Sequence, residues 1–182
     1  MKVKKKAQNL IEFVIVTPLL LVILFGIMEM SLFWKATQTV QNIALQAASA
    51  AAATYVADNA TTNDAATNAT NIVKNRIGSL GIKNITLNQQ PIQTGYGTAP
   101  FALYEYRSAQ TRTIDTGTVP LIIFTVDYRD PYQRGVVTQL IYQYRTLLFG
   151  IAFSLPGVVQ KVTIIPRDIQ ISSTKIQQYN QY

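Results

Sequence analysis

A long apolar stretch near the N-terminus is the clearest pattern in the chain. Residues 13–28 are uncharged and almost wholly apolar, and Glu12 and Glu29 border them. With the apolar residues that flank it, the stretch approaches 25 residues. A helix rises about 1.5 Å per residue, so this stretch can cross a hydrocarbon layer of roughly 30 Å. The pattern therefore predicts a membrane-spanning helix, with Trp34 as an interfacial anchor at its far end.

Helical periodicity continues beyond the apolar stretch. Apolar residues recur at i, i+3, i+4 and i+7 spacing, with Thr, Gln, Asn and Ser between them. Most of them are alanine: Ala36, Val40, Ile43, Ala44, Ala47, Ala48, Ala51 and Tyr55. A continuous helix from Leu10 to about Ala57 would be about 70 Å long. Its upper half can pack on its own domain, on a neighbouring chain, or on both.

A second helix is expected after a loop at 58–63. Asn63 or Asp64 is suited to cap its N-terminus, and Gly78 or Gly81 to end it. The apolar face of this helix consists of Ala65, Ala69, Ile72, Val73 and Ile77.

The rest of the chain alternates strand and turn signals. Strands are predicted at 82–88, 102–108, 118–128 and 158–165, with 169–172 extending the last one. Residues 89–100 read as a loop, 136–149 as a helix and 177–182 as a polar tail. The predicted fold class is α+β, with a small, mainly antiparallel sheet packed against the upper half of the long helix.

A second uncharged run, Leu147 to Val159, contains Gly150, Pro156 and Gly157. It is too short to span a bilayer. We expect it to belong to the core; the alternative is a surface that touches the membrane or another subunit.

The distribution of charged residues predicts the orientation of the helix in the membrane. The chain has 16 Lys+Arg against 9 Asp+Glu, but four of the basic residues are Lys2, Lys4, Lys5 and Lys6. The others are scattered, which excludes the basic stripe of a nucleic-acid binder. Because basic residues flank a span on its cytoplasmic side, the N-terminus is predicted inside and residues from about 36 onward outside.

The amino-acid composition excludes several classes of catalytic and metal-binding site. The chain has no Cys and no His, so thiol catalysis, serine triads and the common zinc sites are excluded. Asp127 and Asp130 could hold Ca²⁺, but they lack the Gly-spaced loop of an EF-hand and are better explained as turn residues. We therefore expect no catalytic residue, no metal site and no cofactor.

The residues before the span form a short basic leader. Residues 4–13 read KKKAQNLIEF, and no small-x-small signal-peptidase site follows the apolar stretch. This pattern resembles the class III leader of type IV pilin-like proteins, in which Gly usually precedes the cut. The resemblance implies cleavage by a prepilin peptidase between Ala7 and Gln8, which would make Glu12 and Phe13 the fifth and sixth mature residues.

Residues 8–53 resemble the N-terminal region of TadE-like pseudopilins, the minor pilin-like proteins of tight-adherence (Tad) pili. The residues that carry the resemblance are Glu12-Phe13, Pro18, Gly26-Ile27 followed by Glu29, Phe33-Trp34, and Val40-Gln41-Asn42 before an Ala-rich helix. The resemblance implies a leader at 1–7, a transmembrane and stalk helix at 8–57, and an extracytoplasmic domain at 58–182. It further implies a single-pass protein of the cytoplasmic membrane whose partners are the prepilin peptidase, other pilin subunits and the pilus assembly machinery.

Glu12 has two interpretations. It can sit solvated at the membrane interface, as Glu29 can at the other end. It can instead pair with the new α-amine of Gln8 on a neighbouring subunit, since an ionisable group inside a span favours a partner.

The leading function is a structural minor pilin that serves adhesion or secretion. The alternatives are a main fibre subunit and a single-pass envelope protein that binds its ligand without polymerising.

Overall fold

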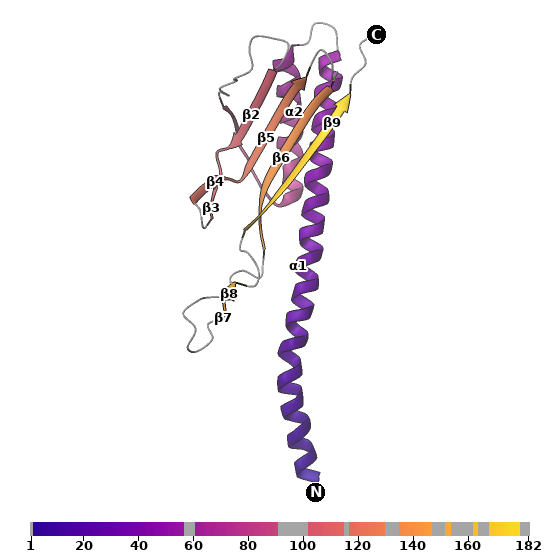
Figure 1. The fold of residues 1–182 in the computed structure, drawn as a ribbon, viewed down its shortest axis with the longest axis vertical. Coiled ribbons are helices and arrows are strands. Elements are labelled where there is room, and N and C mark those ends of the chain that lie inside the picture. The colour runs from indigo at the N-terminus through magenta and orange to yellow at the C-terminus, as the bar shows by residue number, and fades with distance from the viewer. Residues whose placement is uncertain are drawn as a thin grey trace. The chain divides into compact units, whose positions relative to one another are not determined.

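The computed structural model describes residues 2–56, 61–90, 102–114, 117–129, 135–146, 152–153, 162–163 and 168–178. The chain forms two compact units, one of Met1–Lys35 with Arg145–Arg167 and one of Ala36–Tyr144 with Asp168–Tyr182. We call the second unit the head domain. It combines helices with an antiparallel sheet (Figure 1), so the predicted α+β class is confirmed.

The helices are α1 (Lys2–Val56), α2 (Thr62–Arg76) and the short 3-10 helix η1 (Ile77–Leu80). The strands are β1 (Leu87–Gln90), β2 (Ala102–Ser108), β3 (Thr111–Ile114), β4 (Gly117–Pro120), β5 (Ile122–Arg129), β6 (Gly135–Arg145), β7 (Ala152–Phe153), β8 (Val162–Thr163) and β9 (Asp168–Gln178). The continuous long helix predicted from 10 to about 57 is confirmed up to Val56, and α1 begins earlier than expected.

The main sheet of the head domain has five strands in the order β1-β2-β5-β6-β9. Strands β1, β2, β5 and β6 pair antiparallel, with Tyr106 opposite Phe124 and Phe124 opposite Leu140. Helix α2 lies against one face of this sheet (Figure 1). The largest fully buried side chains include Tyr128, Phe124 and Leu140 from the sheet and Val40 from α1.

The upper part of α1 packs on the same sheet. The hydroxyl of Thr138 in β6 donates a hydrogen bond of 2.9 Å to the carbonyl of Ala44 in α1. The rings of Tyr55 in α1 and Tyr128 in β5 lie 5.3 Å apart. The alanines that were predicted to form the apolar face are buried: Ala36, Ala44, Ala47, Ala48 and Ala51. Small side chains let the helix backbone approach the strands closely enough for this contact.

Residues 136–149 were predicted to be a helix, and this prediction is wrong. Gly135–Arg145 form strand β6, and 147–149 lie outside the described residues. Val136, Thr138, Leu140, Tyr142 and Tyr144 alternate along one face, and all five are buried. The spacing of Val137, Leu140, Ile141 and Tyr144 fits a helix equally well, but β-branched and aromatic residues favour a strand when neighbouring strands are available.

The long strand predicted at 118–128 is interrupted. Residues 117–120 form β4, which pairs with β3 in a separate hairpin, whereas β5 begins at Ile122 in the main sheet. Pro120 has no N–H to donate to a strand ladder. At the break, the N–H of Leu121 donates to the carbonyl of Gln110, at 2.9 Å. The chain therefore changes sheets at Leu121.

The start of α2 differs from the prediction by a few residues. Thr61, and not Asn63 or Asp64, is the N-cap, and its side chain accepts a hydrogen bond from the N–H of Asp64. The Asp64 carboxylate accepts in return from the N–H of Thr61, at 3.0 Å, which completes a capping box. Gly81 is one of the two glycines that were predicted to end this helix. It follows η1 and has a φ of 79°.

The other strand predictions hold in part. The strand at 102–108 is confirmed as β2. The strand expected at 82–88 is reduced to β1, because Asn84 has a φ of 54° and the carbonyl of Asn84 accepts from the side chain of Gln110. Of residues 158–165 only Val162–Thr163 are described, as β8, and β9 is a separate, longer strand than the predicted extension at 169–172. The predicted tail overlaps the end of β9 at Gln177 and Gln178, and 179–182 lie outside the described residues, as do 91–100 of the predicted loop.

Candidate assembly site on the N-terminal helix

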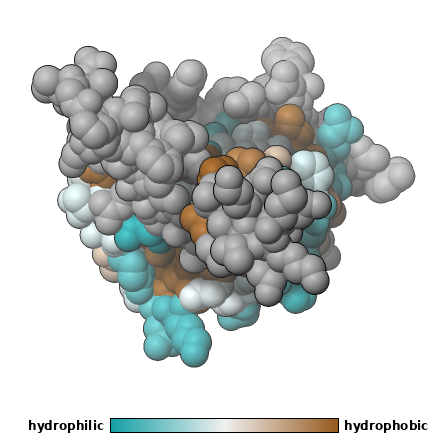
Figure 2. Space-filling view, turned by 90° about the horizontal axis from the view of Figure 1, so that it is seen from below, coloured by the Kyte–Doolittle hydropathy of each residue, from teal (hydrophilic) through white to brown (hydrophobic). Residues whose placement is uncertain are grey.

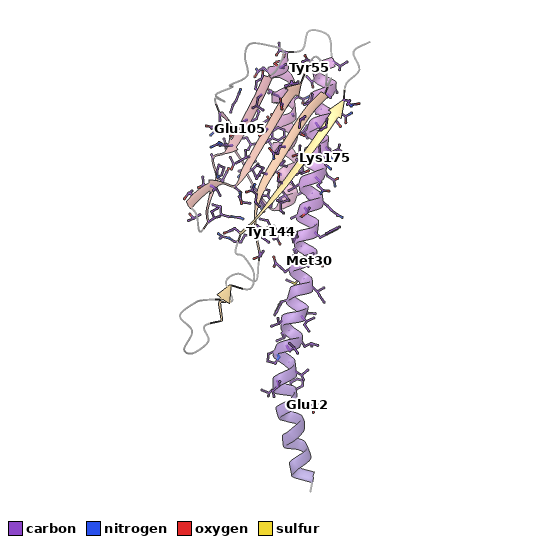
Figure 3. The ribbon with its side chains drawn as sticks, in the orientation of Figure 1. Glu12, Met30, Tyr55, Glu105, Tyr144 and Lys175 are labelled. Atoms are coloured by element: carbon purple, nitrogen blue, oxygen red, sulfur yellow. The ribbon has the colours of Figure 1, made fainter. Side chains whose placement is uncertain are left out.

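The lower part of α1 exposes its apolar side chains. Apart from the half-buried Phe33, the large hydrophobic residues from Phe13 to Trp34 have exposed fractions of 37–69%. Figure 3 shows side chains extending from the helix between Glu12 and Met30, and Figure 2 shows hydrophobic surface in brown in the view from below. Only 6% of the most apolar 18-residue window of this helix is buried within the chain. By length and composition, the helix can cross a membrane, in contrast to a core helix of a soluble protein, which would be mostly buried.

The residues predicted to act in processing and assembly all lie on α1. Ala7 and Gln8 are in its helical backbone, and their side chains are outside the described set. Glu12 and Phe13 follow, both exposed. They occupy the same short segment of helix, so one neighbouring molecule could contact both.

The three residues predicted within the span are spread along the helix. Pro18 lies inside α1, where it removes one backbone donor. A Cβ added at Gly26 would meet nothing within 4 Å. Trp34 is 60% exposed and lies 22 residues beyond Glu12, about 33 Å along the helix axis. The structure therefore places these residues at separate levels of one exposed helix and does not gather them into a pocket.

Glu29 differs from Glu12 in its surroundings. Only 8% of Glu29 is exposed, and it is the one charged residue among the buried residues of the described part of the chain. One of the two interpretations from the sequence gave both acids the same role, as solvated residues at the two membrane interfaces. Glu29 precedes Ala36 by seven residues and Val40 by eleven, so it continues the 3–4 spacing of the buried positions. This spacing was the signal that could have distinguished Glu29 from Glu12.

Within the head domain, polar contacts join α2 to strand β2 and to the C-terminal end of α1. The Tyr104 hydroxyl and the Thr62 hydroxyl lie 2.8 Å apart, and Asn68 donates to Thr54 at 2.7 Å. Burial raises the pKa of the Tyr106 phenol, although a hydrogen bond with Thr70 partly offsets the effect. These contacts are those of a packed domain that supports the helix.

The described residues contain no group of three or more Asp or Glu that could hold a metal ion. Asp127 lies in β5, and Asp130 lies outside the described residues, so the alternative of a Ca²⁺ site between them is untested.

Comparison with known protein families gives a match. The family model described as "TadE-like protein" matches residues 9–49. No curated protein matches the chain. No solved structure matches it either. The matched range contains Glu12, Phe13, Pro18, Gly26 and Trp34, and it ends in the alanine face that the head domain covers. Over residues 9–49, the N-terminal helix of the chain is therefore similar to TadE-like proteins.

Proposed function

We propose that this TadE-like protein is a minor pilin, or pseudopilin, that takes part in assembling a Tad pilus. The observation that carries the proposal is the division of α1 within the matched range: its lower part exposes apolar side chains and its upper part supports a folded head domain. A helix of this kind can hold a subunit in the membrane before assembly and pack among other subunits afterwards. The role is structural, in a fibre used for adhesion or secretion.

Processing is part of the proposal. A prepilin peptidase would cut between Ala7 and Gln8 on the cytoplasmic side and leave the apolar helix attached. The cut removes the lysines at positions 2, 4, 5 and 6 and creates a free α-amine on Gln8. The shortened helix then begins four residues before Glu12.

Glu12 is proposed to pair with that α-amine on a neighbouring subunit. Its exposure leaves the carboxylate accessible to another molecule, in contrast to the buried Glu29. A carboxylate near the hydrocarbon layer is costly without a partner, so pairing would favour assembly and fix the axial offset between two helices. Phe13 would contact the same neighbour.

Topology completes the proposal. The lysine cluster ahead of α1 supports an N-terminus in the cytoplasm and a head domain outside it. The protein would then be a single-pass protein of the cytoplasmic membrane until it enters a fibre. Its proposed partners are the peptidase, other pilin subunits and the assembly machinery.

The test is the distribution of the protein between membranes and sheared fibres in its native cell. Glu12→Ala should leave the membrane-bound amount unchanged and remove the protein from fibres. Truncating one member of a desolvated ion pair costs about 3–5 kcal/mol, enough to prevent incorporation. The matched control is Glu105→Ala, which removes a carboxylate from β2 in the head domain and should leave incorporation intact.

Normal incorporation of Glu12→Ala would refute the pairing. Absence of the wild-type protein from every fibre preparation would refute the pilin function itself and favour a non-polymerising envelope protein.

A further inference from the structure

The main sheet of the head domain ends in two edge strands, β1 on one side and β9 on the other. Within the described part of the chain, β1 pairs with β2 and β9 with β6, and the outer side of each has no neighbouring strand. Of the uncharged run at 147–159, only Ala152 and Phe153 are described, and neither belongs to this sheet. The outward N–H and C=O groups of an edge strand can accept a further strand.

The two edge strands run in the same direction. Strands β1, β2, β5 and β6 are antiparallel in succession. Arg112 donates a hydrogen bond to the carbonyl of Gln143 in β6 and lies 3.9 Å from the carboxylate of Asp168 in β9. Gln139 in β6 donates to the hydroxyl of Ser172 in β9, so residue numbers fall along β6 as they rise along β9. All neighbouring pairs are therefore antiparallel, and with five strands the two edges are parallel to each other.

The upper part of α1 points the same way as the edge strands. Thr138, the partner of Val126 in β5, donates to the carbonyl of Ala44. Farther along β5, the ring of Tyr128 contacts that of Tyr55, farther along α1. The helix and β5 therefore advance together, and β1 and β9 run parallel to β5 (Figure 1).

We propose that β9 of one copy pairs with β1 of a second copy, so that the two sheets join edge to edge. The inference rests on the proposed function and adds a contact between its subunits. The upper parts of α1 then lie parallel and on the same face of the joined sheet, as copies inserted into one membrane with one topology require. The interface is head to tail, so each pair keeps one outer β1 and one outer β9, and the contact extends into a row of copies.

Pairing between two β9 strands does not meet this requirement. An antiparallel pair would turn the two α1 helices in opposite directions. A parallel pair would place the helices on opposite faces of the joined sheet, which would then separate them. Two β1 strands meet the same obstacles.

The residues of the two edges suit the pairing. Six uncharged residues, 169–174, lie between Asp168 and Lys175 in β9, and β1 has four residues and no charge. Neither strand contains Pro or Gly, which would weaken a ladder. The edges also present exposed amides and hydroxyls, which can bond across the strands: Asn88 in β1, and Gln170, Ser172 and Thr174 in β9.

The β9 edge is formed before a partner binds. The side chains of Arg112 and Asp168 are only 20% and 8% exposed, so water screens weakly the contact that holds the start of β9. The pairing itself is short, because β1 has only four residues. Confinement of both copies to one membrane raises their effective concentration, which lets a short contact form. Edge pairing then sets the rotation of the heads, in addition to any contact between the α1 helices.

Cysteine cross-linking tests the pairing with the full chain in liposomes of phosphatidylethanolamine and phosphatidylglycerol. Because the chain has no Cys, each introduced cysteine is the only one in its chain. One population carries Asn88→Cys, and a second population, distinguished by a peptide tag, carries Gln170→Cys, Ser172→Cys or Thr174→Cys. Neighbouring strands lie about 4.8 Å apart, within the Cα separation that a disulfide allows. The control mixture replaces Asn88→Cys with Thr67→Cys, on the exposed side of α2.

Mixed dimers between Asn88→Cys and at least one of the β9 positions should form several-fold faster than those with Thr67→Cys. Rates equal to the control at all three positions would overturn the edge pairing. Dimers that form equally fast in a β9 population alone would also overturn it, since two β9 strands would then meet.

A charge exchange gives a second test, at the β9 position that cross-links fastest, for example Ser172. Like charges opposite each other disfavour strand pairing, and opposite charges favour it. Asn88→Lys with Ser172→Lys should lower energy transfer between two dye-labelled populations several-fold, and Asn88→Lys with Ser172→Glu should restore it. The dyes are attached through Thr67→Cys. Both variants place charges at the same two positions, so equal transfer in the two would overturn the pairing.

Sheared fibres from the native cell separate this contact from the proposed function. The same cysteine variants should give the cross-link between β1 and β9 in fibres. Protein that enters fibres without this cross-link would overturn the pairing and leave the pilin function intact. Absence of the protein from fibres would refute the pilin function, whereas cross-linking in liposomes would still support the edge contact.

Discussion

Ala7 is the residue on which the proposed processing depends. A prepilin peptidase has to accommodate the side chain before the cut, so a bulky residue there should block cleavage. We expect Ala7→Leu to leave a chain that is seven residues longer and confined to the membrane, without change to the head domain. Mass spectrometry of the N-terminus measures the result, and an intact Met1 on wild-type protein from native fibres would contradict it.

The capping box of α2 gives a pH-dependent prediction. Hydrogen bonds from the side chain and the backbone N–H of Thr61 lower the pKa of the Asp64 carboxyl below its ordinary value. A lowered pKa in the folded state means that the ionised carboxylate stabilises the fold above the ordinary pKa. This contribution is lost as the pH falls through the lowered value.

Asp64→Asn should therefore reduce the thermal stability at pH 6 and lose this effect in acid, once the pH is below the lowered pKa of Asp64. Asp64→Glu keeps the geometry of a capping box and should behave as the wild type at both pH values. Thermal unfolding of the full chain in detergent, followed by circular dichroism, measures the difference. An equal deficit for Asp64→Asn at both pH values would show that ionisation is not the cause.

At the scale of elements, the sequence predicted the two helices and β2 because their signals are local. Strand β6 was missed because Leu140, Ile141 and Tyr144 fit a helical period as well as an alternating one. Only the neighbours β5 and β9 decide between them, and these pairings are not local. The break between β4 and β5 at Leu121 was missed for the same reason, since it depends on a contact with Gln110 in a preceding turn.

The candidate site was predictable to the extent that it lies on one continuous helix. The span, Glu12 and Trp34 follow from a pattern within 30 residues. The burial of Glu29 and the ion pair of Arg112 with Asp168, at 3.9 Å, were not foreseen. The ion pair joins residues 56 positions apart, and no spacing rule connects residues so far apart in the sequence.

The contact between β6 and α1 gives a prediction at the same scale. Thr138 is fully buried, and its hydroxyl donates to Ala44, whose carbonyl is already part of the helix. Thr138→Val keeps the shape of the side chain and removes the bond, which should lower the free energy of unfolding by about 1 kcal/mol. Thr174→Val, on the exposed side of β9, is the control and should change it by less than about 0.5 kcal/mol. Denaturant unfolding of the full chain in detergent checks both, and equal effects would contradict the role of the bond.

The orientation of the whole molecule is also testable. If the lysines hold the N-terminus inside, the head domain is outside the cytoplasm. In a chain without other cysteines, Thr174→Cys should react with a membrane-impermeant maleimide on spheroplasts as fully as it does after lysis. Labelling that appears only after lysis would place the head domain inside and contradict the topology.

The contact of Thr138 with Ala44 spans 94 positions, which has a consequence for the order in which the molecule folds. Helix α1 forms from neighbouring residues within microseconds, whereas its cover in the head domain requires β6 and β9 from the far end of the chain. During synthesis, the alanine face of α1 is therefore complete long before the strands that bury it arrive. In that interval another newly made helix could occupy the face, so the rate at which the rest of the chain is synthesised sets the time during which wrong pairing competes with correct folding.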